Sequence, residues 1–371
     1  MKLSNLEDTI ISFCIRNKNY LFILFLSFMA ICIRLSFFSY SSGDYEGALN
    51  IWFNLYKENG ISYLKYNIGD YNVIYNFILA LLSYIPIKSL YSIKLVSLIF
   101  DFLCAIMGGK IVKQITNNKK LSIITYIIIL YLPTLLFNSS LWGQCDSIYA
   151  FFALFSIFYL IKEKYFLSFI MLGISFAFKL QAVFLLPLYI IYYVYKRKFS
   201  ITYFLLIPLV NILCSTPALI MGRSLKDVLM IYYNQANLYS NYVLNFPNMY
   251  MFIGEYDNLD KFGIYLIIVI FAFMLYYIIS KKIKLEGKNI MFIAMISVII
   301  SCYFLPFMHD RYLFMADIMS VIWYILNKNS KYLYVPIVVN LISLFTYISY
   351  LFSIVIIDFK ILSLIYLLVL V

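Results

Sequence analysis

Apolar residues along the chain gather into long runs, and shorter polar segments separate one run from the next. Several runs reach the roughly 20 residues that a helix needs to cross the hydrocarbon core of a bilayer. The pattern predicts an all-α polytopic membrane protein, a bundle of about 12 transmembrane helices. The predicted spans are residues 20–40, 92–112, 121–137, 141–160, 166–178, 182–195, 201–221, 264–280, 290–306, 312–326, 332–357 and 361–371.

Two polar segments are longer than simple turns. The first, residues 41–91, contains the pattern of an amphipathic surface helix at 45–56 and an apolar run at 73–87. We expect this run to lie at the outer surface, or to dip into the bilayer and return, because a crossing would invert every later loop. The second long outer segment is residues 222–263. The whole chain, residues 1–371, is expected to form one integral membrane domain.

Composition supports the membrane assignment. The 371 residues are 64% hydrophobic and 12% charged, whereas soluble proteins average about 45–50% and about 25%. These values exclude a soluble globular protein, a disordered chain and a disulfide scaffold. The six cysteines are scattered, mostly within apolar runs, which favours small core residues over metal ligands. The Ile, Lys and Asn bias indicates an AT-rich genome and predicts a bacterial source.

Charge orients the chain in the membrane. The formal net charge is +12, and basic residues cluster in the short loops 162–164, 196–198, 281–288 and 328–331. All four loops fall on one side of the predicted topology, and the positive-inside rule makes that side cytoplasmic. We therefore expect a multi-pass protein of the cell membrane with a cytoplasmic N-terminus and two long extracytoplasmic segments.

Five separated polar clusters fall on the outer face, which is the arrangement that an active site at the interface needs. The clusters contain Asp44, Tyr45, Glu46 and Trp52; Asp70; Trp142, Gln144 and Asp146; Lys179 and Gln181; and His309, Asp310 and Arg311. Structural explanations also exist: helix caps for the Gly-Asp pairs, interfacial anchoring for tryptophan, and snorkelling for the basic residues. Within the spans, we expect Asp101 to make an interhelix hydrogen bond, and Asp317 to pair with a basic group or stay protonated.

These clusters carry a family resemblance. The segment GDYEGALNIWF after the first span, and the later GDYN, resemble motifs of the dolichyl-phosphate-glucose-dependent glucosyltransferases. The segments SLWGQCDSIYAFF, FKLQAVFLLPLYII and FLPFMHDRYLF resemble bacterial relatives of the second mannosyltransferase of GPI-anchor assembly. Both groups belong to the GT-C superfamily. The chain departs from the pattern at Val73-Ile74, where prolines are usual, and at His309-Asp310-Arg311, where the eukaryotic enzymes have His-Glu-Lys.

The resemblance implies transfer of a hexose, glucose or mannose above all, from a polyprenyl-phosphate donor to an acceptor hydroxyl on the outer face, with inversion. By position it makes Asp44 the catalytic base, with Glu46 or Asp70 as alternatives. Donor-binding candidates are the cations and aromatic or polar residues near these acids: Arg34, Lys179, Gln181, His309, Asp310, Arg311, Trp142, Gln144, Asp146, Tyr45 and Trp52. The acceptor is expected to be a lipid-linked glycan, a polymer or a protein, with no nucleic acid as partner.

Other functions are compatible with the same pattern. No cofactor is expected, although Asp44 and Glu46 offer oxygen ligands for a divalent cation. A polytopic transporter or lipid flippase is the main alternative, but such proteins place ionisable groups near the midplane and often have repeated halves. The third possible function is a polysaccharide polymerase or ligase. Such an enzyme would use long outer loops rich in arginine, whereas segment 222–263 has few basic residues.

Overall fold

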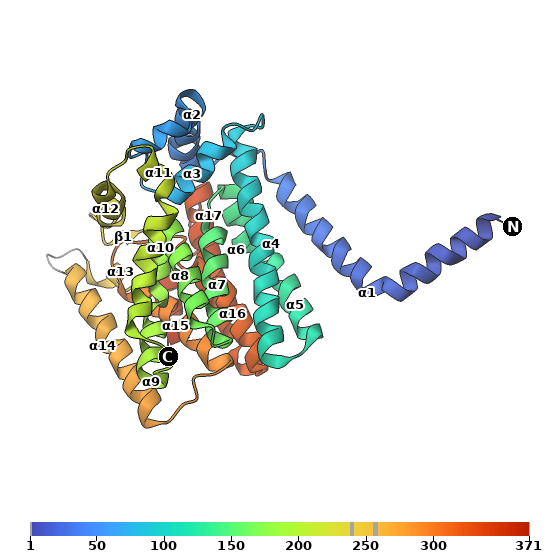
Figure 1. Ribbon diagram of the computed structural model, residues 1–371. Helices are drawn as coiled ribbons and strands as arrows, with labels where there is room; N and C mark the ends of the chain where they lie inside the picture. Colours follow the sequence, from blue (N-terminus) through green and yellow to red (C-terminus); the bar gives the residue numbers. More distant parts are fainter. Residues whose placement is uncertain (1, 238–240, 255–258, 371) are drawn as a thin grey trace.

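The computed structural model describes residues 2–237, 241–254 and 259–370. It is 79% helix and 1% strand, which confirms the predicted all-α class. Figure 1 shows a bundle of helices with α1 (Lys2–Ser36) leaving its side. The bundle helices are α4 (Ser89–Thr116), α5 (Lys119–Leu130), α6 (Pro133–Leu136), α7 (Asp146–Ile161), α8 (Tyr165–Phe178), α9 (Leu186–Lys196), α10 (Leu206–Cys214), α14 (Leu259–Ser280), α15 (Lys288–Phe304), α16 (Phe314–Asn327), α17 (Tyr334–Phe352) and α18 (Phe359–Leu370).

Four helical stretches of the described residues are long and apolar enough to cross a membrane: Glu7–Ser36, Ser89–Thr116, Lys261–Ser280 and Ser330–Phe352. The bent pair Lys119–Leu130 and Pro133–Trp142, with an angle of 47°, adds a fifth if it counts as one span. Eight more apolar helices have only 10–17 residues. The membrane character of the chain is therefore supported, whereas the number of about 12 spans remains a prediction.

Several predicted boundaries differ from the helices observed. The first helix begins at Lys2 rather than at residue 20. The span predicted to begin at residue 141 begins at Asp146, because the π-helix η3 (Phe137–Trp142) ends in a left-handed turn at Gly143, where φ is 80°. Pro133 begins a new helix after α5, since proline cannot continue the hydrogen-bond ladder of the preceding turn.

The first outer segment folds into short helices at one end of the bundle (Figure 1). They are η1 (Tyr45–Leu49), α2 (Asn50–Asn59), η2 (Ile61–Lys65) and α3 (Val73–Leu82). The ten residues of α3 span about 15 Å, half of the roughly 30 Å hydrocarbon core. On its own α3 is too short to cross, as are several bundle helices, so the position of the run at 73–87 relative to the membrane stays a prediction.

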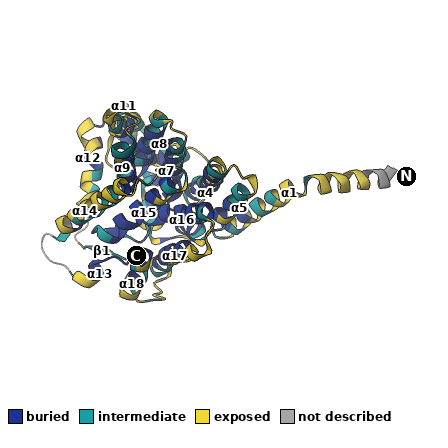
Figure 2. Cartoon of the chain, turned by 90° about the horizontal axis from the view of Figure 1, so that it is seen from below, coloured by how far each residue is buried: buried dark blue, intermediate teal, exposed yellow. Residues whose placement is uncertain are grey.

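The second outer segment contributes α12 (Leu225–Ala236), β1 (Val243–Leu244) and α13 (Tyr250–Ile253), and follows η5 (Ile201–Leu205) and α11 (Thr216–Ile220). Strand β1 pairs in parallel with β2 (Met308–His309), a contact that the sequence pattern did not predict. This pairing brings the second outer segment against the turn that carries Arg311. Figure 2 shows that α7, α15 and α16 form the buried centre, whereas α1, α12 and α14 are largely exposed.

Candidate functional site

Asp44 lies in the turn between α1 and η1, at the end of the bundle where the outer segments gather. Ser42 holds this turn in place: its hydroxyl donates to the carbonyl of Trp142 over 2.7 Å and accepts from the amide of Tyr45 over 3.2 Å. The Asp44 side chain keeps 25% of its surface exposed. The carboxylate is therefore fixed by the fold and still reachable from outside.

The two carboxylate oxygens of Asp44 have different surroundings. Oδ2 accepts from the indole Nε1 of Trp142 at 2.9 Å, from Nε2 of Gln144 at 2.5 Å and from Nη1 of Arg311 at 3.2 Å. Oδ1 accepts from the hydroxyl of Tyr350 on α17. Three donors thus occupy Oδ2 and one occupies Oδ1.

The left-handed turn after η3 presents two of these donors. Gly143 adopts φ 80°, a conformation that costs glycine little, and it allows Trp142 and Gln144 to face the same carboxylate. The Trp142 ring stacks on Tyr350, with centroids 4.6 Å apart and planes at 18°. The carbonyl of Gln144 accepts from Ser97 over 2.6 Å. These contacts hold the donors rigidly around Asp44.

A second carboxylate, Asp146, begins α7 and is nearly fully buried. It accepts from Nζ of Lys179 at 2.5 Å and from Nδ2 of Asn138 at 2.8 Å, and Nε of Arg311 lies 3.8 Å away. Lys179 has extended backbone dihedrals at the end of α8, which interrupts the helix at the site. The predicted cluster at 142–147 and the predicted cluster at 178–181 therefore meet at Asp146.

Arg311 and Tyr71 connect the two carboxylates. The guanidinium of Arg311 contacts Asp44 and Asp146, and its centre lies 5.4 Å from the Trp142 ring centroid. The Tyr71 hydroxyl donates to Oε1 of Gln144 over 2.6 Å and accepts from Nη2 of Arg311 at 3.5 Å. Burial raises the pKa of Tyr71 well above its usual value, so Tyr71 acts as a neutral donor. We call Asp44, Asp146, Lys179, Arg311 and their hydrogen-bonded partners the carboxylate network.

His309 and Asp310 precede Arg311 and have unusual protonation. Burial and the nearby Arg311 guanidinium lower the pKa of His309 to about 3, so its ring is neutral at pH 7. Burial raises the pKa of Asp310 to about 7, although Arg311 and the hydrogen bond from Asn245 oppose this. The neutral His309 ring is therefore not a cation of the site, and the basic side chains that contact its carboxylates are Lys179 and Arg311.

Some candidates lie outside the carboxylate network. Arg34 forms a buried ion pair with Asp101 at 2.9 Å, so its predicted contact with a donor phosphate has no support. Tyr45 turns its hydroxyl to Asn50 and Ser89, and exposed Glu46 accepts from Ser41. Trp52 and Asp70 line a neighbouring cavity, and Gln181 is buried with no hydrogen-bond partner for Oε1 among the described residues.

The two expectations for acids within the spans have different outcomes. Asp101 accepts from Arg34 of α1 and, over 2.6 Å, from Ser139 of η3, which confirms the interhelix hydrogen bond. Asp317 accepts from Ser343 of α17 over 2.8 Å, and no basic side chain of the described residues forms a salt bridge with it. Of the two alternatives predicted for Asp317, pairing with a basic group is thus not observed among the described residues, which leaves the protonated carboxyl.

Sequence reasoning missed four members of the carboxylate network and its surroundings: Tyr71, Asn138, Asn245 and Tyr350. Tyr71 was visible as part of the GDYN segment, although it was not singled out. Asn245 reaches Asp310 only because β1 pairs with β2. Tyr350 lies inside an apolar run of α17, where nothing distinguishes it from the many other tyrosines.

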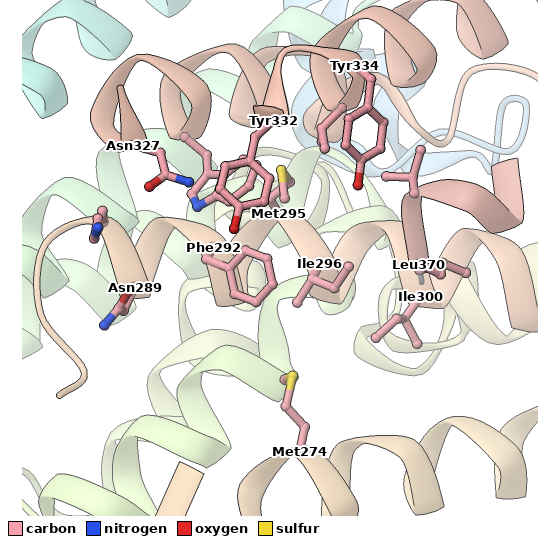
Figure 3. A pocket seen from close by; sticks show the side chains of 14 residues that line it. Met274, Asn289, Phe292, Met295, Ile296, Ile300, Asn327, Tyr332, Tyr334 and Leu370 are labelled. Atoms are coloured by element: carbon pink, nitrogen blue, oxygen red, sulfur yellow. The ribbon is translucent and has the colours of Figure 1, made fainter. Parts of the chain in front are cut away.

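Another cavity lies away from the carboxylate network. It has a volume of about 530 Å³ and lies between α14, α15, α16, α17 and α18. Figure 3 shows Phe292, Met295 and Ile296 of α15 on one side of it and Tyr332 and Tyr334 on the other. Its lining shares no residue with the carboxylate network. Among the described residues, no group of three or more His, Cys, Asp or Glu is placed to hold a metal ion.

These features define the class of the protein as a helical membrane protein with a polar, charged network at one end of its bundle. No model of a known protein family matches this chain, and no curated protein matches it. The GT-C resemblance therefore rests on the quoted motifs alone.

Proposed function

We propose that the protein is a membrane glycosyltransferase that moves a hexose from a polyprenyl-phosphate donor to an acceptor hydroxyl. The observation that carries this proposal is the Asp44 carboxylate, one quarter exposed and held by Trp142 and Gln144 directly beside Arg311. A fixed carboxylate next to fixed cations is what a displacement needs when a hydroxyl attacks and a phosphate leaves.

The distribution of donors favours one atom of Asp44 as the proton acceptor. Oδ2 of Asp44 already accepts three hydrogen bonds, whereas Oδ1 contacts Tyr350 alone among the described residues. In the proposed step, Oδ1 takes the proton of the acceptor hydroxyl as the oxygen bonds to the anomeric carbon. The bond from that carbon to the phosphate oxygen breaks on the opposite face, so the electron pair leaves with the polyprenyl phosphate and the configuration inverts.

The cations of the carboxylate network are suited to the leaving group. Arg311 presents a planar fork of donors that matches phosphate geometry. Its Nε is buried and lies 3.8 Å from Asp146, whereas its side chain keeps 15% of its surface exposed. Lys179 lies within 5.1 Å of the Tyr71 ring, on the same side of the site as Asp146. Asp146 keeps both cations in place before the donor binds.

The proposed topology has about 12 spans, a cytoplasmic N-terminus and an extracytoplasmic site. The lysine-bearing turns after α4, α9 and α14 lie at the end of the bundle away from α2 and α3 (Figure 1). Under the positive-inside rule, this arrangement supports an extracytoplasmic position for the carboxylate network. In this topology the apolar helices of 10–17 residues also cross the membrane, and the turns next to them add to the length of each span.

The test is transfer of radiolabel from polyprenyl-phosphate glucose, mannose and galactose in liposomes that contain the protein and an extract of membrane-lipid acceptors. The wild type is compared with Asp44→Asn and, as a matched control, with Glu58→Gln on an exposed position of α2. We expect transfer by the wild type and the control but not by Asp44→Asn. Movement of labelled lipid across the bilayer without transfer would instead support a flippase, and no turnover of any donor would contradict the proposal.

A further inference from the structure

A cavity of about 390 Å³ opens where the two outer segments meet. Three elements build it: α2, the loop before α3, and α12. Its lining includes Trp52, Asn67, Gly69, Asp70, Asn234 and Gln235. The volume is at the lower end of the roughly 300–1,000 Å³ of small-ligand sites, so the space suits one or two sugar rings.

The lining combines one aromatic ring with amide and carboxylate groups. An indole offers an apolar face to the C–H groups of a pyranose, and side-chain amides both donate to and accept from its hydroxyls. The described lining contains no lysine, arginine or histidine, and it contains Asp70. A phosphate would meet the Asp70 carboxylate in the lining, and the nearby Arg223 guanidinium is engaged with Asn67, so the chemistry favours a neutral sugar.

Polar groups in this cavity have unused hydrogen-bonding capacity. Oε1 of Gln235 is shielded from solvent and has no partner among the described residues. Oδ1 of Asn67 accepts from Nη2 of Arg223 over 2.7 Å, which orients the amide and leaves its NH₂ group to donate. A buried acceptor without a partner is costly, so a turn of the Gln235 side chain toward the cavity, where a ligand hydroxyl supplies the missing hydrogen bond, is favoured.

The fold fixes the indole that would stack on the sugar. Gly69 has φ +64°, and a Cβ at this position would lie 2.2 Å from Cζ2 of Trp52. The indole therefore packs directly on the Gly69 backbone, a contact that only glycine allows. The Trp52 and Tyr71 rings also meet at a steep angle, with centroids 5.4 Å apart and planes at 70°. The ring is thus positioned before any ligand binds.

Tyr71 connects this cavity to the carboxylate network. Its ring contacts Trp52, its hydroxyl donates to Gln144, and the Gln144 amide donates to Asp44. A sugar held on Trp52 would therefore be connected to the proposed base through Tyr71 and Gln144. This connection is what an acceptor needs, since the donor phosphate belongs with the cations.

We propose that this cavity is the acceptor subsite and binds a neutral pyranose unit of the acceptor glycan. The assignment to the acceptor rests on the proposed glycosyltransferase function, whereas the sugar-binding chemistry rests on the cavity itself. Trp52 stacks on the ring, Asn234 and Gln235 bind its hydroxyls, and Asp70 accepts from a further hydroxyl. The sequence indicated Asp70 as an alternative base and Trp52 as a donor-binding residue. In this proposal both residues bind the acceptor instead.

The test is ligand-detected saturation-transfer NMR with the full-length protein in nanodiscs and no donor present. The probes are the methyl glycosides of glucose, mannose, galactose and N-acetylglucosamine. The variants are Trp52→Ala, Gln235→Ala and Gly69→Ala, the last of which displaces the indole while keeping it present. Asn54→Ala, at an exposed amide of the same helix as Trp52, is the matched control.

At least one glycoside should bind to the wild type and to Asn54→Ala. Gln235→Ala should weaken binding about 3- to 10-fold, as expected for the loss of one hydrogen bond, and Trp52→Ala and Gly69→Ala should abolish it. Binding that is unchanged in Trp52→Ala and Gln235→Ala, or no binding of any glycoside to the wild type, would overturn the subsite. If the variants weaken glycoside binding as expected but the wild type transfers no sugar, the sugar site stands and the proposed glycosyltransferase function is contradicted.

Discussion

Two Asp–Arg pairs in this protein have the same chemistry and opposite surroundings. Arg34 and Asp101 lie 2.9 Å apart, and their side chains are 1% and 0% exposed. Arg311 and Asp44 lie 3.2 Å apart, with 15% and 25% of their side chains exposed. The first pair joins α1 to α4 and also contacts η3, whereas the second faces the outer end beside two more ionisable groups. Accessibility, rather than residue type, separates a structural ion pair from a candidate reactive one.

The buried pair provides the largest expected effect on stability. Asp101→Asn leaves the Arg34 guanidinium charged, buried and without its partner, which costs about 3–5 kcal/mol in comparable cases. We expect a large fall in the thermal unfolding temperature of the purified protein. The double variant Arg34→Met/Asp101→Leu removes both charges and should recover most of the loss. Equal instability of the double and single variants would argue that packing alone holds this region.

Arg311→Lys tests the accessible pair in the proposed reaction. Lysine keeps the positive charge but loses the planar fork that contacts Asp44 and Tyr71. We expect transfer to fall on the order of 10²-fold, the scale seen when one donor to a developing anion is removed. Arg197→Lys, at an exposed turn after α9, is the control and should keep full rate. An unchanged rate in Arg311→Lys would mean that charge alone is sufficient.

Asp310 shows what burial does to a carboxyl next to Arg311. Its pKa, raised by burial from 3.8 to about 7, means that the folded state binds the proton more tightly than the unfolded state. The stabilising contribution is therefore complete below about pH 4 and is lost as the pH rises through about 7. Asp310→Asn, which cannot ionise, should therefore stabilise the protein more at pH 8 than at pH 5, by a difference on the order of 2–3 kcal/mol at about 1.4 kcal/mol per pH unit. Thermal unfolding at both pH values measures this, with Asp8→Asn as exposed control; equal effects at both values would contradict it.

The ion pair between Lys196 and Glu286 is more exposed than either Asp–Arg pair, and we expect it to contribute least to stability. Lys196 and Glu286 lie 3.1 Å apart, with 21% and 68% of their side chains exposed. Surface pairs of this kind contribute about 0–1 kcal/mol, because water and salt screen them. Lys196→Gln should therefore change the unfolding temperature little at physiological salt. A loss similar to that of Asp101→Asn would show that exposure is not the deciding variable.

The sequence predicted the carboxylate network better than it predicted the helices that carry it. Asp44, Trp142, Gln144, Asp146, Lys179 and Arg311 were all singled out, because polar residues stand out against apolar runs, and the structure brings them together. Helix boundaries were harder. Hydropathy does not distinguish a straight span from one that bends at Pro133 or ends in a turn at Gly143.

Contacts between distant segments were beyond the sequence pattern. Arg34 was placed with the site because it lies near the end of an apolar run, yet its partner Asp101 lies 67 positions away on α4. The two-residue pairing of β1 with β2 is too short to leave an alternating pattern. Tyr350 enters the site through tertiary packing of α17, and single-sequence periodicity contains no information on which tyrosine faces Asp44.

The most direct test measures stability and transfer together for Asp44→Asn and Asp101→Asn. Both substitutions remove one carboxylate charge from an ion pair, and transfer is expressed per amount of folded protein. The account predicts that Asp44→Asn unfolds close to the wild-type temperature and loses about 10²–10⁴-fold in transfer, whereas Asp101→Asn unfolds earlier and keeps its rate when folded. Full transfer by Asp44→Asn would contradict the account, because the accessible carboxylate would then have no part in the reaction.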